Sequence, residues 1–209
     1  MSEQPYNPLD KRHLGESVAD AILQRPITPL PPAEAFVGAG IYAIYYTGNF
    51  RGYEPLAKRN RENRYSWPIY VGKAVPVGAR KGGFGLGINP GRVMYMRLRE
   101  HAESIEQAKN LNLGDFTCRY LVVDDIWIPL GESLLIEKFS PVWNRALDGF
   151  GNHDPGTRRA TQYRSPWDVV HPGRPWVEKL AKHPKADTEL LAAVREYLKE
   201  TEKILGPCP

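Results

Sequence analysis

Residues 40–46 of this 209-residue chain read GIYAIYY, and this short stretch decides the fold. Its β-branched and aromatic side chains favour a buried strand. Alternation along a strand places Tyr42, Ile44 and Tyr46 on one face and the residues between them on the other. A buried tyrosine needs a hydrogen-bond partner for its hydroxyl, so the tyrosines of this strand require an explanation.

Patterns elsewhere in the chain predict the elements around this strand. Two further strands are predicted at 68–72 (PIYVG) and 116–123 (FTCRYLVV). Apolar spacing and flanking prolines predict helices at about 14–23, 92–110, 129–140 and 188–203. The prolines at 26–32 predict an extended linker. The first two strands are separated by few helical residues, which favours a hairpin. We therefore expect an α+β domain with a small antiparallel β-sheet of about three core strands, flanked by helices.

Length and composition predict a single domain outside the membrane. The hydrophobic share of 42% is enough for one core, expected at about 38–146, with an N-terminal arm at 1–37 and a C-terminal extension at 147–209. No apolar run is long enough to span a membrane, and no signal peptide is visible. Cys118 and Cys208 fit no metal or disulfide spacing, which favours a cytoplasmic protein with reduced thiols. The net charge of +4 is too small to indicate a polyanionic partner by itself.

A glycine-rich segment at 76–90 is the first candidate for a ligand site. The sequence Gly85-Leu86-Gly87 continues with Ile88-Asn89-Pro90, where a dinucleotide-binding loop needs a further glycine. The phosphate-binding loop motif is also absent from the sequence. We interpret this segment as a surface loop.

Four residues further along the chain, one pair and two single positions, carry weak signals when each is taken alone. Arg97 and His101 are four residues apart, so they project from one face of their predicted helix, beside its apolar stripe. A cation held there requires an anion, such as a phosphate. Glu132 near a helix start is explained by the helix dipole, worth about 0.3–1 kcal/mol. Asn144 is explained equally well as a turn residue.

Taken in chain order, these signals resemble the signature of the GIY-YIG nuclease family. Six elements occur in the family's order: GIY at Gly40–Tyr42, YVG at Tyr70–Gly72, Lys73, the Arg97–His101 pair, Glu132 and Asn144. The resemblance covers about half of the chain. The chain departs from the family in two ways: Tyr70 follows Tyr42 by 28 positions, where the family has a short connection, and Val71 replaces an isoleucine.

The resemblance implies hydrolysis of a phosphodiester by one-step attack of water, with a site made of the signature residues. These implied site residues are Tyr42, Tyr70, Lys73, Arg97, His101, Glu132 and Asn144. Glu132 is the expected ligand of Mg²⁺ or Mn²⁺, because a hydrated Mg²⁺ binds through one or two carboxylates. Glu137 is the alternative ligand, although the twelve-residue spacing to Asn144 favours Glu132. Arg97 is expected to stabilise the negative charge that develops on the phosphate.

Tyr42 is the expected general base, which raises an energetic difficulty. A free phenol has a pKa near 10, so about one molecule in a thousand is ionised at pH 7. We expect Lys73, Arg97 and the metal to lower that cost by favouring the phenolate. Tyr70 is expected to orient water or phosphate, and His101 to relay a proton or contact phosphate.

Three other residues are given supporting roles. Asn144 is expected to position the backbone near Glu132. Tyr45 and Tyr46 are interpreted as packing residues whose hydroxyls reach the surface or DNA.

The chain contains no separate DNA-binding domain that its sequence reveals, which favours recognition by insertions and the C-terminal extension. The basic residues expected to reach DNA are Arg51, Lys58, Arg59, Arg61, Arg64, Arg80 and Lys81. Such a self-contained nuclease most resembles a type II restriction endonuclease, in particular the branch that cuts the palindrome CCGCGG. One site per chain and a palindromic target then imply a homodimer on double-stranded DNA, with a companion DNA methyltransferase in the host. The alternatives are a repair or homing nuclease of relaxed specificity and a non-cleaving DNA-binding protein.

Overall fold

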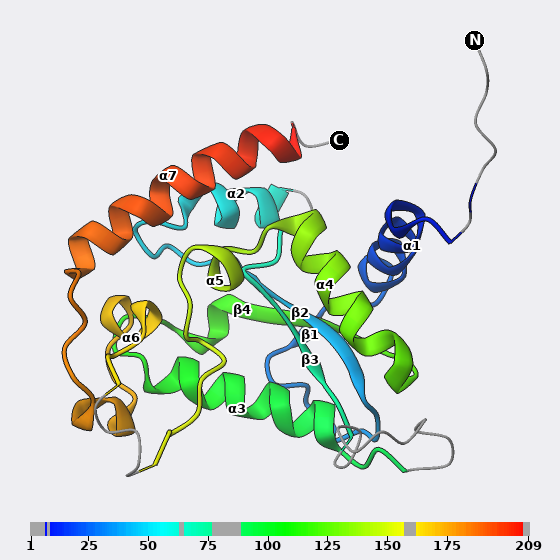
Figure 1. Ribbon diagram of the computed structural model, residues 1–209, viewed down its shortest axis with the longest axis horizontal. Helices are drawn as coiled ribbons and strands as arrows, with labels where there is room; N and C mark the ends of the chain where they lie inside the picture. The colour runs from blue at the N-terminus through cyan, green and yellow to red at the C-terminus, as the bar shows by residue number, and fades with distance from the viewer. Residues whose placement is uncertain (1–6, 8, 63–64, 77–88, 157–161, 207–209) are drawn as a thin grey trace.

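The computed structural model describes residues 7, 9–62, 65–76, 89–156 and 162–206 (Figure 1). Its helices are α1 (Lys11–Leu23), α2 (Glu54–Glu62), α3 (Val93–Gln107), α4 (Ile128–Phe139), α5 (Val142–Arg145), α6 (Pro166–Val170) and α7 (Asp187–Leu205). Its strands are β1 (Thr28–Pro29), β2 (Gly40–Tyr46), β3 (Tyr70–Ala74) and β4 (Phe116–Val122). Short 3₁₀ turns lie at Leu113–Asp115, Asp125–Trp127 and Pro175–Lys179.

The strands form one antiparallel sheet in the order β1-β4-β2-β3. The three predicted strands and the α+β class are confirmed, and β2 is the inner strand between β3 and β4. The fourth strand, β1, comes from the segment expected to be only a linker. Pro29 is tolerated there because β1 lies at the sheet edge, where a missing N–H costs no ladder hydrogen bond.

The connection between β2 and β3 is more structured than expected. The polar insertion contains α2, which buries Leu56 and Ala57 and packs against α7 (Figure 1). The two strands pair antiparallel from Gly40 opposite Ala74 to Ile44 opposite Tyr70. The predicted pairing is therefore confirmed, with a helix inserted between its two strands.

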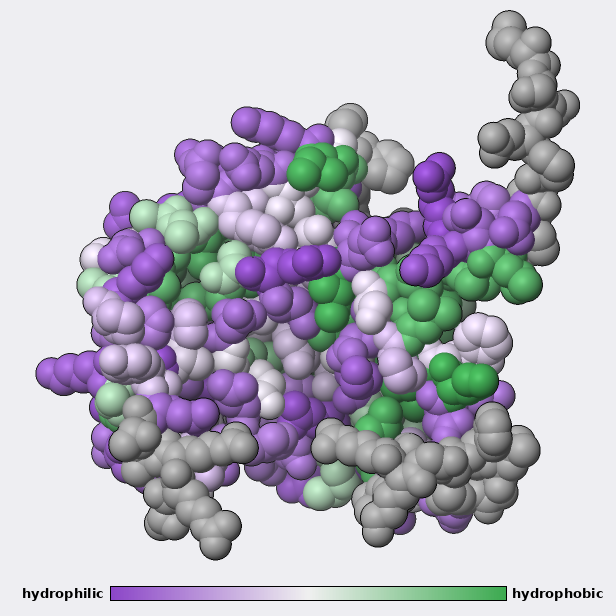
Figure 2. Space-filling view, viewed as in Figure 1, coloured by the Kyte–Doolittle hydropathy of each residue, from purple (hydrophilic) through white to green (hydrophobic). Residues whose placement is uncertain are grey.

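The two faces of the sheet carry separate hydrophobic clusters. Tyr42, Ile44 and Tyr46 belong to the cluster with α2, α3, α5 and the C-terminal extension. Ile41, Ala43 and Tyr45 belong to the cluster with α1 and α4. This division confirms the alternation predicted for β2. Apolar atoms are also visible at the surface between α1 and α4 and at the C-terminal end of α7 (Figure 2).

The prediction that Tyr45 and Tyr46 reach the surface is wrong for both hydroxyls. The side chains are fully buried, and the Tyr46 hydroxyl accepts a hydrogen bond of 2.7 Å from the backbone N–H of Phe50. Tyr46 thereby fastens the start of the insertion that leads into α2. Both residues are packing residues, as expected.

Helix ends follow the local sequence. Pro129 stands in the first turn of α4, where its missing N–H has no helical partner to lose. Ser140 ends the helix in the left-handed conformation, with φ of 43°, and Pro141 follows it. These two prolines confirm the helix bounds read from the sequence. Glu132 is thereby held in the early part of α4, facing β3.

A buried polar network joins the C-terminal extension to the core around the sheet. His171 is fully buried and lies 2.7 Å from the Tyr53 hydroxyl through Nε2 and 2.9 Å from the Asn110 side-chain oxygen through Nδ1. The Trp143 indole donates to the same Tyr53 hydroxyl at 2.8 Å. Asn110 in turn donates to the carbonyl of Val170 at 2.8 Å. The contacts suit a neutral imidazole that donates at Nδ1 and accepts at Nε2.

Burial lowers the pKa of His171 to about 3, and burial also lowers the pKa of His101 well below its ordinary value. His171 is therefore neutral in the folded protein at pH 5, whereas it binds a proton in the unfolded chain below about pH 6.5. Since the unfolded state then holds more protons, stability must fall as the pH falls from about 6.5 toward 3.

We expect His171 to contribute about 1.4 kcal/mol of lost stability per pH unit in that range, and His101 to act in the same direction. Urea unfolding at pH 7.0 and 5.0 measures the loss. His171→Gln removes one titrating group, so its unfolding free energy should depend less steeply on pH than that of the wild type. His183→Gln, which changes an exposed histidine, should keep the wild-type slope. An unchanged slope in His171→Gln contradicts the assignment.

Candidate active site

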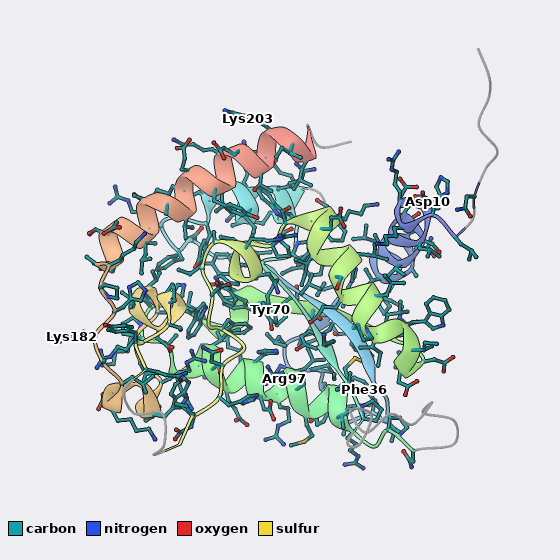
Figure 3. The ribbon with its side chains drawn as sticks, viewed as in Figure 1. Asp10, Phe36, Tyr70, Arg97, Lys182 and Lys203 are labelled. Atoms are coloured by element: carbon teal, nitrogen blue, oxygen red, sulfur yellow. The ribbon has the colours of Figure 1, made fainter. Side chains whose placement is uncertain are left out.

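The predicted site residues meet at an open depression of about 660 Å³ beside β3. The depression is bounded by β2, β3, α3, α4 and the loop after α5. Five of the seven predicted residues line it: Tyr42, Tyr70, Lys73, Arg97 and Glu132. Tyr70 on β3 and Arg97 on α3 lie close together (Figure 3). The remaining two residues, His101 and Asn144, lie behind this lining and support it.

The glycines of the two tripeptides are required by close approach. A Cβ at Gly72 would lie 2.5 Å from the Tyr42 hydroxyl oxygen, so the Tyr42 ring lies directly over the backbone of β3. A Cβ at Gly40 would lie 2.1 Å from the backbone oxygen of Leu121. Gly72 therefore lets the Tyr42 hydroxyl extend across the edge strand, and Gly40 lets β2 approach β4.

Tyr42 and His101 form a buried pair. The Tyr42 hydroxyl lies 2.7 Å from Nε2 of His101, and both side chains are almost completely buried. Burial raises the pKa of Tyr42 well above its ordinary value, with a smaller contribution from Tyr70, while Arg97 acts in the opposite direction. The pKa of His101 is lowered, chiefly by burial and also by the charge of Arg97. The pair is thus a neutral phenol beside a neutral imidazole.

The expected direction of the Arg97 effect is confirmed, since Arg97 acts to lower the pKa of Tyr42. Desolvation by burial is the larger effect, so the pKa of Tyr42 lies above its ordinary value. His101 is not among the described residues that line the depression, and it lies behind Tyr42. A role for His101 must therefore pass through the Tyr42 hydroxyl.

The two faces of the sheet both contribute to the depression. Lys73 stands opposite Ile41 in the register, on the face covered by α4, and its ammonium lies 2.6 Å from a carboxylate oxygen of Glu132. Tyr42 and Tyr70 belong to the other face, covered by α3. Since β3 is an edge strand, groups from both faces can meet around it.

Arg97 is held in place by three neighbours. One guanidinium nitrogen donates to Glu100 at 2.8 Å and lies against Nε2 of His153, and the other donates to the carbonyl of Gly151 at 2.9 Å. The side chain remains partly exposed in the depression. These contacts orient the guanidinium while part of it still faces the space where a phosphate would enter.

Asn144 acts on β3 rather than on α4. The backbone N–H of Val71 donates to the Asn144 side-chain oxygen at 2.8 Å, and the Asn144 amide donates to the Val71 carbonyl at 2.9 Å. The side chain therefore replaces a neighbouring strand at the sheet edge. It fixes Val71, the residue between Tyr70 and Gly72, on the strand whose Lys73 lies against Glu132. The expected role of Asn144 in positioning the backbone near Glu132 stays a prediction.

A family model described as the Eco29kI GIY-YIG domain matches residues 34–198. The chain belongs to the Eco29kI GIY-YIG domain family. It is thus a GIY-YIG nuclease domain of the restriction-endonuclease type, and DNA is the substrate of such a nuclease. No curated protein matches the chain. The matched range extends well beyond the signature residues, into α7.

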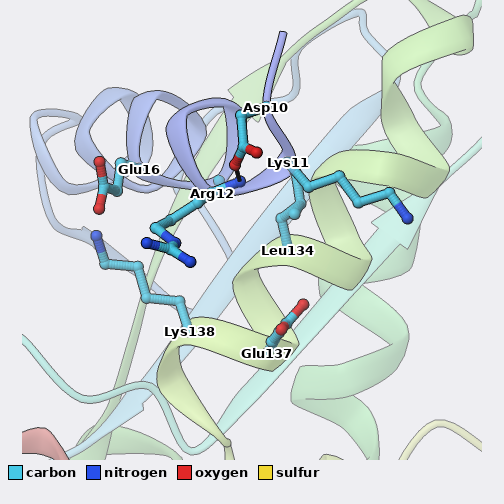
Figure 4. Close-up of a pocket in the computed structure, with 8 residues that line it drawn as sticks. Asp10, Lys11, Arg12, Glu16, Leu134, Glu137 and Lys138 are labelled. Carbon is cyan, nitrogen blue, oxygen red and sulfur yellow. Dashed lines mark hydrogen bonds between the residues drawn. The ribbon is translucent and has the colours of Figure 1, made fainter. Parts of the chain in front are cut away.

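The sequence of this GIY-YIG domain left two glutamates, Glu132 and Glu137, as alternative metal ligands, and the structure places them at different sites. Glu132 lines the depression with Tyr42 and Arg97. Glu137 lines a different depression of about 450 Å³ between α1 and α4, beside Lys11 and Lys138 (Figure 4). The helical turn that separates the two residues directs Glu137 away from the predicted site.

The residues predicted to reach DNA have different surroundings in the structure. Arg59 is buried, donates to the carbonyl of Gly206 at 2.8 Å and lies over the Trp67 ring, so the prediction for Arg59 is wrong. It instead binds the C-terminal end of α7, where carbonyl groups lack helical partners. Arg64, Arg80 and Lys81 lie outside the described residues.

The other three basic residues of the insertion stay at the surface. Arg51 is exposed, Lys58 lies 3.9 Å from Glu62, and Arg61 donates to Asn49 at 3.2 Å. None of the three is among the described residues that line the depression of the GIY-YIG site. Their contact with DNA remains a prediction.

Several residues of the depression were missed from the sequence. Arg92, Glu100, Gly151 and His153 all line it. The i, i+3 spacing of Arg97 and Glu100 on α3 is a signal that points to their ion pair. Gly151 and His153 follow the last signature residue, and no periodic pattern links that loop to the site.

The carboxylate chemistry is compatible with a hydrated divalent cation. Glu132 is partly exposed in the depression, with one oxygen against Lys73. Among the described residues there is no cluster of three or more histidine, cysteine or acidic side chains that suits a metal ion. Hard cations such as Mg²⁺ and Mn²⁺ keep several waters and bind through one or two carboxylates, so the chemistry of a single glutamate fits them.

Within the same described ranges, no helix has the length and apolar content needed to cross a bilayer.

Loss of the Asn144 side chain should loosen β3. Asn144→Ala removes both partners of the Val71 backbone, so we expect it to lower the unfolding free energy by about 1–3 kcal/mol. Asn49→Ala, at a site with one exposed hydrogen bond, should change stability by less than about 0.5 kcal/mol. Urea unfolding of the two variants compares them, and equal small changes would show that Asn144 does not hold the edge strand.

Proposed function

We propose that this chain is a type II restriction endonuclease that hydrolyses phosphodiester bonds of double-stranded DNA at a palindromic, GC-rich site. CCGCGG is the first sequence to test. The observation that carries the proposal is the convergence of a phenol, a guanidinium and a carboxylate, from Tyr42, Arg97 and Glu132, on one open depression. These groups come from segments far apart in the chain, and packing for stability alone gives no reason for them to share an open surface.

Tyr42 and His101 activate the attacking water in this proposal. Neutral His101 accepts the Tyr42 hydroxyl proton at Nε2, which leaves the Tyr42 oxygen free to accept a proton from water. As the water oxygen bonds to phosphorus, the bond from phosphorus to the leaving oxygen breaks, the water proton moves to Tyr42 and the Tyr42 proton moves to His101. This relay avoids a free phenolate, which burial disfavours, and protonates His101 only transiently, because burial also lowers the pKa of that imidazole.

Arg97 stabilises the charge that develops on the phosphate. Its guanidinium is oriented in advance by Glu100 and Gly151, so little reorganisation is needed when charge accumulates on the non-bridging oxygens. Arg92, exposed on the rim of the same depression, adds a further cation near the DNA backbone. Tyr70 orients the water or the phosphate from β3.

Glu132 would hold the divalent cation, Mg²⁺ or Mn²⁺, with Lys73 beside it. A cation bound there supplies electrostatic stabilisation of the leaving oxygen. Lys73 keeps the carboxylate of Glu132 directed at the depression through their 2.6 Å contact. The active site of each chain cuts one DNA strand, so cleavage of both strands at a palindrome uses a homodimer. A companion methyltransferase would protect the host's own sites.

The first test uses purified protein and a large DNA that contains CCGCGG sites. We expect discrete fragments with Mg²⁺ and intact DNA with EDTA. Discrete fragments whose sizes fit the sites of another sequence change the proposed target. A smear indicates a nuclease of relaxed specificity. Intact DNA with both Mg²⁺ and Mn²⁺, despite binding in a gel-shift assay, indicates a non-cleaving DNA-binding protein and contradicts the proposal.

The second test addresses the base. Tyr42→Phe should lower the single-turnover cleavage rate by about 10²–10⁴-fold while leaving DNA affinity unchanged, because the hydroxyl acts in proton transfer and not in binding. Tyr45→Phe is the matched control, since it removes an equally buried hydroxyl from the opposite face of β2. Near-normal cutting by Tyr42→Phe removes Tyr42 from this role.

A further inference from the structure

Arg174, in the C-terminal extension between α6 and the turn at Pro175–Lys179, is a buried cation outside the predicted site. Only 2% of it is exposed. Its guanidinium lies over two indole rings, 4.6 Å from the centre of Trp167 and 4.7 Å from that of Trp176. Burial of a charged group is costly unless it is paired and hydrogen-bonded, so the surroundings of Arg174 must compensate for that cost.

The compensation comes from one carboxylate and one short loop. Nε donates to Asp168 at 2.7 Å, and Nη2 lies 2.7 Å from the same oxygen. The remaining donors reach three backbone carbonyls, from Nη2 to Gly149 at 2.9 Å and from Nη1 to Phe150 at 3.1 Å and Asn152 at 3.2 Å. A guanidinium has five N–H groups, and these contacts provide an acceptor for each.

Asp168 is itself fixed within α6. Its second oxygen accepts a hydrogen bond of 2.6 Å from the Ser165 hydroxyl. The backbone N–H of Trp167 also donates to the carbonyl of Asp148 at 2.9 Å, which ties the start of α6 to the same loop. Arg174 therefore connects a rigid anchor in the extension to the loop at 149–152.

That loop touches three predicted site residues. The Phe150 ring stacks on the His101 imidazole, with centres 4.6 Å apart and planes 18° apart, and also packs edge-on against Tyr70 at 5.0 Å. The Gly151 carbonyl accepts the hydrogen bond from Arg97. A Cβ at Gly151 would lie 2.8 Å from the Tyr70 hydroxyl oxygen and 3.3 Å from a guanidinium nitrogen of Arg97. The loop at 149–152 is thus packed closely against His101, Tyr70 and Arg97.

We infer that Arg174, held by Asp168, is a positioning residue for the nuclease reaction that acts through Phe150 and Gly151 on His101, Tyr70 and Arg97. The inference rests on the proposed function, because it assigns Arg174 an effect on that same site. Lysine cannot replace arginine here. An ammonium group has three donors and no planar fork, so it cannot bind Asp168 and three carbonyls at once.

The test compares Arg174→Lys with Arg119→Lys. Arg119 is a matched control because it is also buried and donates to two backbone carbonyls, of Arg25 at 2.8 Å and Tyr65 at 2.6 Å, on the face of the sheet away from Tyr42. At a temperature where both variants are folded, we expect Arg174→Lys to lower kcat by about 10–100-fold with little change in KM. Arg119→Lys should keep the wild-type kcat.

A second measurement reads position without activity. In Arg174→Lys the Phe150 ring should no longer shield His101, so the pKa of His101, followed by NMR titration, should move up toward its ordinary value. Arg119→Lys should leave it unchanged. If the wild type cuts DNA and Arg174→Lys loses no more activity than Arg119→Lys, the inference is overturned while the proposed function stands.

If the wild type cuts no DNA, the proposed function fails, and an unchanged His101 titration in Arg174→Lys overturns the positioning separately. Should Arg174→Lys fail to fold, Gly151→Ala decides instead. Gly151 is not among the glycines with positive φ, so alanine fits its backbone, and the added methyl group displaces Tyr70 and Arg97. Folded Gly151→Ala protein with wild-type kcat overturns the inference.

Discussion

The contact between the Tyr42 ring and the bare backbone of Gly72 is the constraint on which the predicted site depends. Because Gly72 has no side chain, Tyr42 lies across β3 and places its hydroxyl at the sheet edge. An inner strand would separate the two faces of the sheet, whereas β3 is an edge strand with no further strand beside it among the described residues. Lys73 and Glu132 from one face can therefore meet Tyr70 and Tyr42 from the other.

A free sheet edge must also be stabilised, and the chain uses an amide side chain for that purpose. Asn144 pairs with both backbone groups of Val71 and so takes the place of a further strand. The strand that carries Tyr70, Gly72 and Lys73 is thereby fixed on both of its sides. An edge strand that is rigid in this way can carry reactive groups without opening the sheet.

Burial opposes ionisation of both members of the Tyr42–His101 pair, although the proposed reaction requires proton transfer between them. Desolvation moves the two pKa values apart, upward for the phenol and downward for the imidazole, so neither group is charged in the resting protein. A neutral pair costs little to bury, and its 2.7 Å contact provides a path for a proton when one is needed. The C-terminal extension contributes to this burial through Phe150, which covers His101. The C-terminal extension therefore packs directly against residues of the predicted site.

The sequence by itself determined three of the four described strands, the main helices and the candidate site residues, because strand alternation, helical spacing and ordered motifs are local properties of the chain. It also favoured Glu132 over Glu137, through its spacing to Asn144. Only the tertiary structure decided what each residue touches. Arg59 looked like a surface cation by composition, yet it binds the end of α7, and Arg174, with no local signal, binds the loop beside Arg97. Contacts between distant segments depend on how the faces of the sheet are covered, and no short pattern in the chain encodes that arrangement.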